Sequence, residues 1–263
     1  MSPYLLLSLF ASTLYGFLAW RIFRTPGVQA VGLKVLLSVA LLLHAGLVYE
    51  SVLGRGVIAL GFGNALSTIS WLTAVIYWTI SHRTPLMRIQ AWVTLIAAIA
   101  VVLPVIFPNA HAIPNSEATA LRAHLVVSLL AYSLFAIAAL HAVLMTALEK
   151  KLHRGVGLRG EAPPLLTLEA VLFKTVTAGF ILLTLTVFSG AVFSEELFGQ
   201  PLQFTHKIVF AMLSWGVFGG LLLGRHFRGW RGRIALYWTL TGFVLLLLAY
   251  VGTQFVLEIL LQR

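Results

Sequence analysis

Eight long apolar runs dominate this sequence and restrict what it can fold into. A membrane-spanning helix needs about 20 predominantly apolar residues. Hydrocarbon offers the backbone no hydrogen-bond partners, so each run should be helical. We therefore predict an all-α polytopic membrane protein with eight spans. The expected spans are Pro3–Trp20, Gly32–Tyr49, Ala59–Ile80, Ala91–Phe107, Ala123–Leu148, Ala170–Phe193, Ile208–Gly224 and Leu236–Leu261.

The composition supports a protein whose solvent is the lipid bilayer. Hydrophobic residues make up 60% of the chain and charged residues 10%, whereas soluble domains carry about 25% charged residues. The chain has no cysteine, which excludes thiol chemistry and a covalent c-type haem attachment site within it. The net charge of +10 could indicate nucleic acid, but in a polytopic protein loop charge that sets orientation explains it better. We expect no nucleic-acid partner.

Basic residues predict the orientation. None precedes the first apolar run, and Arg21 and Arg24 follow it, so we expect an uncleaved helix with its N-terminus outside. Eight spans then place the C-terminus outside as well. The inner loops would hold 13 of the 18 basic residues, the excess expected on the inner side of a multi-pass protein of the bacterial inner (plasma) membrane. The 13 are Arg21, Arg24, Lys34, Arg83, Arg88, Lys150, Lys151, Arg154, Arg159, Arg225, Arg228, Arg231 and Arg233.

The loops are too short to contain a soluble domain. We expect an N-terminal four-helix part, residues 1–120, and a second part, residues 121–263, that together form one integrated domain. The fourth span should stop or kink near its end, because Pro104 cannot donate a helical hydrogen bond and Pro108 follows it.

Two histidines are the main candidates for chemistry. His124 and His206 open the fifth and seventh spans, so both should lie near the outer face. Neutral imidazole is a good axial ligand for haem iron, and the pair is predicted to hold haem b. Alternatively, each makes only a local hydrogen bond at a helix end. The adjacent cations Arg122 and Lys207 would pair either with haem propionates or with lipid phosphates.

Other residues are secondary candidates. His44 lies about 15 Å beyond Lys34 along the second span. One interpretation is that it is a functional group, in a second haem site or on a transit route for haem. The other is that it is a neutral side chain hydrogen-bonded to a neighbouring helix. His141 lies about 25 Å further along the helix than His124, and we expect a structural role for it. Three aromatic residues at the outer end would either form a platform for a flat macrocycle or only pack at the interface. They are Phe193, Phe198 and Phe204.

Three stretches resemble a known family. They are AHLVVSLLAYSLFAIAALHAVLMTALEKKL (123–152), LTLEAVLFKTVTAGFILLTLTVFSGAVFSEELFG (166–199) and SWGVFGGLLLGRHFRGWRGRIALYWTLTGFVLLLLAYVG (214–252). They are similar to cytochrome c assembly proteins of the CcsA/CcmC type, from Leu121 to the C-terminus, and a variant of that family has the same eight-span layout. The resemblance implies haem handling at the outer membrane face and presentation of haem to apocytochrome c.

The chain departs from that family at its haem-presenting loop. The family's tryptophan-rich motif WGxxWxWDPKE corresponds here to FGQPLQFTHKI (198–208). Gly199 and Lys207 are kept, whereas the tryptophans, the aspartate and the proline are replaced by Phe198, Leu202, Phe204, Thr205 and His206. The family's C-terminal outer histidine is also missing. His124 matches the first outer ligand of the family, and His206 would substitute for the missing one.

The sequence thus predicts a haem-binding membrane protein that acts in cytochrome c assembly or haem handling. Its expected partners are haem, the bilayer, and apocytochrome c or other assembly proteins. One alternative is an accessory or scaffold protein that keeps the fold and has lost the haem. Another is a transporter, although the spans hold few ionisable residues. We expect no enzyme, because no nucleophile lies beside an evident base.

Overall fold

The computed structural model describes residues 2–24, 31–54, 56–81, 87–108, 111–113, 116–153, 165–192 and 205–256. The chain forms two compact units. Unit 1 comprises residues 1–117 and 257–263, and unit 2 comprises residues 118–256.

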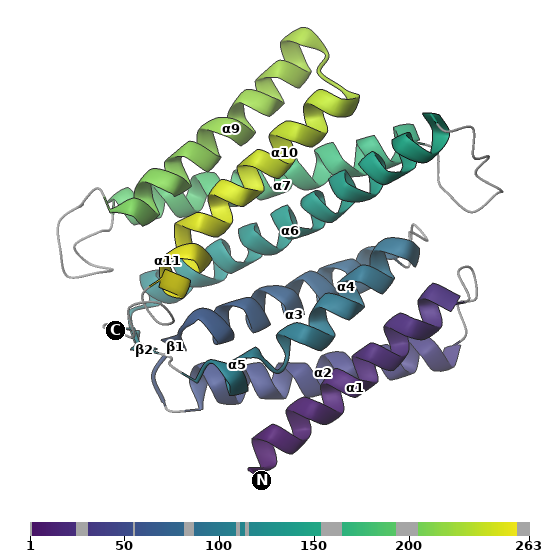
Figure 1. The fold of residues 1–263 in the computed structure, drawn as a ribbon. Helices are drawn as coiled ribbons and strands as arrows, with labels where there is room; N and C mark the ends of the chain where they lie inside the picture. Colours follow the sequence, from purple (N-terminus) through teal and green to yellow (C-terminus); the bar gives the residue numbers. More distant parts are fainter. Residues whose placement is uncertain are drawn as a thin grey trace. The chain divides into compact units, whose positions relative to one another are not determined.

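Both units are built from long helices (Figure 1). Unit 1 contains α1 (Pro3–Arg24), α2 (Val31–Leu53), α3 (Phe62–Ser81), α4 (Met87–Ala100), the short α5 (Leu103–Ile106), and the strands β1 (Ala59–Leu60) and β2 (His111–Ala112). Unit 2 contains α6 (Thr119–His153), α7 (Leu165–Val192), α9 (His206–Arg228) and α10 (Gly232–Leu247). The last of these continues as a π-helix, η1 (Leu248–Gly252), and as α11 (Thr253–Phe255).

The predicted all-α polytopic fold class is confirmed. Each of the eight predicted spans falls on a helix in the described residues, and seven helices there are long and apolar enough to cross a membrane. The helix of the third predicted span, α3, is not among these seven. It buries polar side chains in unit 1. These are Asn64, Ser67, Thr68, Ser70 and Thr73.

One predicted boundary in unit 1 was wrong. The third span was expected to begin at Ala59, but Ala59 pairs with Ala112 and Leu60 with His111 in an antiparallel ladder. The helix begins only at Phe62.

The break expected near the end of the fourth span is present. α4 ends at Ala100, and the chain continues as α5 from Leu103. Pro104 lies in the first turn of α5, where its missing N–H costs no hydrogen bond.

The long helices of unit 1 pack as a ring in which each contacts two neighbours: α1 lies against α2 and α4, and α3 against the same two helices. Three of the described hydrogen bonds link α2 to α3, one of them from Asn64 Nδ2 to the Ser51 carbonyl at 2.9 Å. Trp71 Nε1 donates to the Leu41 carbonyl at 3.0 Å, and His44 Nε2 lies 2.9 Å from Ser67 Oγ.

Unit 2 is a second ring, in the order α6, α7, α9, α10, so α6 and α9 lie diagonally across it. Successive helices run in opposite directions, so α6 and α9 begin at the same end, where α7 and α10 finish (Figure 1). At least one side-chain hydrogen bond crosses each seam of the ring. Among these bonds are His124 to Ser189, Trp215 to Thr184, Ser214 to the Gly242 carbonyl, and Tyr132 to the Leu246 carbonyl.

An aromatic pair fills the middle of unit 2. The rings of Phe135 on α6 and Phe218 on α9 stack across the diagonal, with centroids 3.8 Å apart and planes 17° from parallel. Glycines of the other two helices make room for them. A Cβ on Gly179 would lie 3.1 Å from the Phe135 ring, and a Cβ on Gly242 would lie 2.8 Å from the Phe218 ring.

At the opposite end of unit 2 from His124, two glutamates hold the basic loop between α9 and α10. Glu169 on α7, with a side chain only 10% exposed, accepts from Arg225 at 2.6 Å and lies 3.7 Å from Arg231. Glu149 on α6 lies 3.6 Å from Arg233, a largely exposed side chain. We call this cluster the arginine end. Its cations are therefore not only markers of orientation, because Glu169 of α7 holds Arg225 of α9 and lies near Arg231 at the start of α10.

The aromatic pair yields a first prediction. Gly242→Ala should destabilise the protein by about 1–3 kcal/mol, because the added methyl overlaps the Phe218 ring and overpacks the core. Thermal unfolding in detergent measures the change. The matched control is Gly216→Ala on α9, where a Cβ meets no atom within 4 Å and the substitution should be neutral or stabilising. Equal melting temperatures for the two variants would contradict the packing described.

The arginine end yields a second prediction. Glu169→Gln should cost about 2–4 kcal/mol, because it leaves the partly buried Arg225 guanidinium without its carboxylate. Glu149→Gln is the matched control and should cost less than about 1 kcal/mol, since Arg233 is exposed. The same unfolding assay compares them. A loss at Glu149 as large as that at Glu169 would show that burial does not distinguish the two contacts.

Candidate functional site

The end of unit 2 at which α6 and α9 begin carries the predicted haem residues. We call it the histidine end, defined by residues 119–125, 189–192, 205–210 and 248–256. It gathers His124, Arg122, His206 and Lys207 from two diagonal helices of one bundle (Figure 1). The described residues therefore agree with the expectation that the two histidines lie at one end. Phe193, Phe198 and Phe204 lie outside the described residues.

His124 is the most firmly positioned of these groups. Its imidazole is half-buried, and its Nδ1 lies 2.8 Å from Ser189 Oγ on the last turns of α7. The Ser189 hydroxyl also lies 3.1 Å from the Thr186 carbonyl and donates to it, which leaves its oxygen able to accept from His124 Nδ1–H. In the tautomer that donates in this way the lone pair is on Nε2, the arrangement seen in metal-binding histidines.

His124 also repeats a packing position of the core. It precedes Phe135 by 11 residues, and Gly190 follows Gly179 by 11 residues. Eleven residues are close to three helical turns, so each pair lies on one face of its helix. Accordingly, a Cβ on Gly190 would lie 3.5 Å from His124 Cε1, much as one on Gly179 would meet the Phe135 ring. His124 therefore lies on the same side of α6 as the ring that stacks across the bundle.

On α9 the equivalent position belongs to Lys207. Lys207 precedes Phe218 by 11 residues, whereas His206 precedes it by 12. At about 100° per residue, Lys207 shares the inward face of Phe218 and His206 lies about 100° around the helix. In agreement, Lys207 is partly buried, with its Nζ 5.7 Å from the centroid of the Tyr250 ring, while His206 is exposed. The register thus brings Lys207, rather than His206, toward the side of the bundle that His124 faces.

The two histidines nevertheless match in depth. From the stacked phenylalanines, 11 residues to His124 span about 16 Å and 12 residues to His206 span about 18 Å. The direct pairing of His206 with His124 stays a prediction. Arg122, two residues before His124, is exposed, and its pairing with a propionate also stays a prediction.

His141 lies further along α6 than this end, and His44 belongs to unit 1. His44 is fully buried in unit 1, bonded to Ser67, so the expected hydrogen bond to a neighbouring helix is present. Its predicted role toward haem stays a prediction. On α6, His141 Nδ1 lies 2.9 Å from the Ile137 carbonyl of its own helix, as expected for a structural residue.

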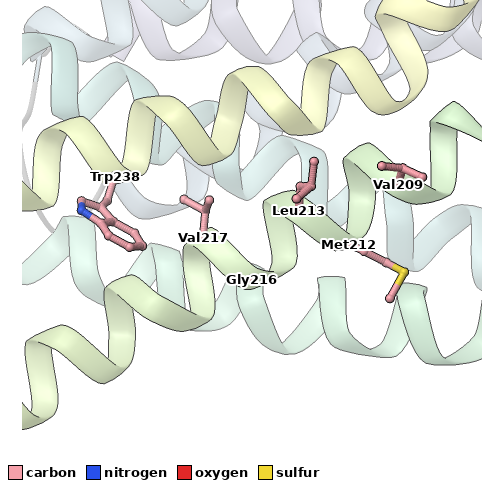
Figure 2. A pocket seen from close by; sticks show the side chains of 6 residues that line it. All are labelled: Val209, Met212, Leu213, Gly216, Val217 and Trp238. Atoms are coloured by element: carbon pink, nitrogen blue, oxygen red, sulfur yellow. The ribbon is translucent and has the colours of Figure 1, made fainter.

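A groove on unit 2 carries no chemistry of its own. It encloses about 550 Å³ along the seam of α9 and α10, and Figure 2 shows its lining: Val209, Met212, Leu213, Gly216, Val217 and Trp238. It presents no charged side chain for a propionate and no imidazole for iron. In a bilayer such an apolar surface suits lipid chains.

Sequence reasoning missed three residues that position this unit. Ser189, the partner of His124, is one of many hydroxyl residues in apolar runs. Tyr250 lies in the π-helix η1, a local feature often found at functional sites but without a sequence signature. Glu169 had a usable signal, because an acidic side chain next to a long apolar run requires a partner.

The fold and these residues define a polytopic membrane protein with an imidazole site at the end of a four-helix bundle. A family model described as "Cytochrome C assembly protein" matches residues 33–261, and the chain belongs to this family. The predicted membership is confirmed. The match starts at residue 33, well before Leu121. The resemblance visible in the sequence begins only at Leu121, because the first helices carry few distinctive residues.

Two named relatives support this family membership. Inner membrane protein YpjD of Escherichia coli (strain K12) is 29% identical over 243 residues, covering 92% of this chain and 89% of that protein. Cytochrome c biogenesis protein CcsA of Prochlorococcus marinus (strain MIT 9303) is 34% identical over 87 residues, covering 33% of this chain and 27% of that protein.

The Ser189 contact yields a third prediction. Ser189→Ala should release the His124 tautomer, so that Nδ1-protonated and Nε2-protonated forms both become populated. Nitrogen-15 NMR of labelled histidine in the purified protein distinguishes the two forms. Ser189→Thr, which keeps the hydroxyl, should preserve the native form. Ser128→Ala is the matched control, since that hydroxyl donates only within α6, to the Leu125 carbonyl. A single unchanged tautomer in Ser189→Ala would refute the assignment.

Proposed function

We propose that the histidine end binds haem b, with His124 and His206 as axial ligands. We also propose that the protein handles haem for cytochrome c assembly at the outer face of the bacterial inner membrane. The observation that carries this proposal is the half-buried His124, whose Nδ1 lies 2.8 Å from Ser189 Oγ. The inner-membrane location follows YpjD, and the role in assembly follows the family and CcsA.

The donor set fits haem better than a bare metal ion. Porphyrin supplies four nitrogen ligands, so two neutral imidazoles complete the iron coordination. Among the described residues no group of three histidine or acidic side chains gathers to hold a metal ion without porphyrin. When bound, haem supplies the iron-porphyrin cargo that assembly of a cytochrome requires. His206 begins α9 and is exposed, so its side chain has room to turn toward that cargo.

The cations next to the histidines suit the haem propionates. Arg122 is exposed, and Lys207 lies over the Tyr250 ring. A cation–π contact of this kind is worth about 0.5–1 kcal/mol, whereas a hydrogen bond to a charged group is worth about 1.5–3 kcal/mol. A propionate would therefore compete favourably for Lys207. Both residues would orient the macrocycle by holding its carboxylates.

Delivery to a protein partner is the less supported part of the proposal. The family presents haem through its tryptophan-rich loop, and here the corresponding residues 198–208 have lost every tryptophan. We propose apocytochrome c or another assembly protein as the recipient. The same loss favours the rival function, a scaffold that keeps the fold without haem.

Absorption spectroscopy tests the haem proposal. Protein purified from haem-replete cells should show a Soret band with a low-spin, bis-histidine spectrum. His124→Ala and His206→Ala should each give a five-coordinate or weakened spectrum, because one axial ligand is lost, and the double variant should lose the band. The matched control is His226→Ala, which removes an exposed histidine at the other end of α9 and should change nothing.

The alternatives give different results in that experiment. Folded protein without any Soret band supports the scaffold function. A spectrum altered by Lys207→Met but not by His206→Ala would show that the inward register of α9 selects the ligand, and would refute the role of His206. Uptake of a solute into vesicles, with no bound haem, would support a transporter.

A further inference from the structure

The core of unit 1 contains two fully buried polar side chains whose rings are in contact. Tyr15 on α1 and His44 on α2 are both 0% exposed, and their rings meet edge to face with centroids 5.7 Å apart. His44 Nε2 is bonded to Ser67. Within the part of the chain that the structure describes, His44 Nδ1 and the Tyr15 hydroxyl have no hydrogen-bond partner.

Such groups are costly in an apolar core. A buried polar atom without a partner loses its hydrogen bonds to water and gains nothing in return, so native cores contain few. On their own helices the residues one turn away do not supply a partner. Ala11 and Ala19 flank Tyr15, and Ala40 precedes His44. The polar residue at this spacing, Ser12, donates its hydroxyl to the Ala98 carbonyl at 2.7 Å.

The missing partner must be neutral and must both donate and accept. No charged residue lies nearby on the two helices: Arg21 and Glu50 are six positions away from Tyr15 and His44, and Lys34 is ten. α3 contains no charged residue at all. Depending on its tautomer, His44 Nδ1 needs either an acceptor or a donor, while the Tyr15 hydroxyl can be either. One molecule of water satisfies both tautomers.

We propose that unit 1 holds a buried water molecule between Tyr15 and His44, at mid-depth in the bilayer. Internal waters of this kind bond otherwise unsatisfied polar groups and are costly to remove. The bond from His44 to Ser67 fixes the imidazole on α3, and the water extends this link to α1. It makes His44 the middle of a polar chain through three helices, Ser67–His44–water–Tyr15. Unit 1 is then held together by a polar chain as well as by apolar packing.

Whether Tyr15→Phe raises or lowers the melting temperature tests the proposed water. If the Tyr15 hydroxyl is unpaired, Tyr15→Phe removes a buried unsatisfied group and should raise the melting temperature. If it bonds the proposed water, Tyr15→Phe should lower it by about 2–4 °C. In a His44→Phe background the effect of Tyr15→Phe should shrink, because both changes break one bridge. Tyr132→Phe, which loses a bond to the Leu246 carbonyl, gives the reference for a broken hydrogen bond.

A second measurement identifies the bridging molecule without substitution. X-ray radiolysis generates hydroxyl radicals from internal water, so mass spectrometry of irradiated wild-type protein should find Tyr15 oxidised. Phe135, equally buried but in the aromatic stack, is the control and should remain unmodified. A raised melting temperature in Tyr15→Phe overturns the proposal. So does a lowered one without oxidation of Tyr15, because the partner is then a direct bond or a ligand other than water.

Discussion

The stack of Phe135 on Phe218 sets the geometry of unit 2. It joins the two diagonal helices, α6 and α9, which otherwise make few contacts with each other. The centroids of the two rings lie 3.8 Å apart. Gly179 and Gly242 allow this, because no side chain on α7 or α10 intervenes. Counting turns outward from the stack then determines which residues α6 and α9 present at the histidine end. The depth and facing of His124 and Lys207 are consequences of the stack and of helical periodicity.

The two ends of unit 2 are built on different principles. At the arginine end, Glu169 and Arg225 are fixed by charge, by the Phe173 ring 4.5 Å below the guanidinium, and by the Trp230 carbonyl. At the histidine end the described contacts include the hydrogen bond between His124 and Ser189 and the cation–π contact of Lys207 with Tyr250. A partly buried ion pair is strongly destabilising to break, so the arginine end is an anchor for α7 and α9.

Most of the fold followed from apolar run length, because in hydrocarbon a run of that length has hardly any alternative to a helix. The missed boundary at Ala59 depended on pairing with Ala112, a contact that no local pattern encodes. The histidines were visible because imidazole is rare in spans. The side of the helix on which each histidine lies could not be predicted. A shift of one residue, from His206 to Lys207, turns the side chain about 100° around the helix axis, and predicted helix boundaries are less precise than one residue. Ser189 was hidden among similar hydroxyls that only bond their own helices.

The altered loop and the retained imidazole are separable in physical terms. The family's tryptophans would offer flat surface to a haem held outside the bundle, and this chain has replaced them with Phe198, Leu202 and Phe204. His124, by contrast, lies 2.8 Å from Ser189 on α7 and follows the register of α6. Loss of the tryptophans would therefore remove a surface for presentation and keep His124, the proposed first ligand. If the proposed function holds, a chain of this kind would retain haem more readily than it passes haem on.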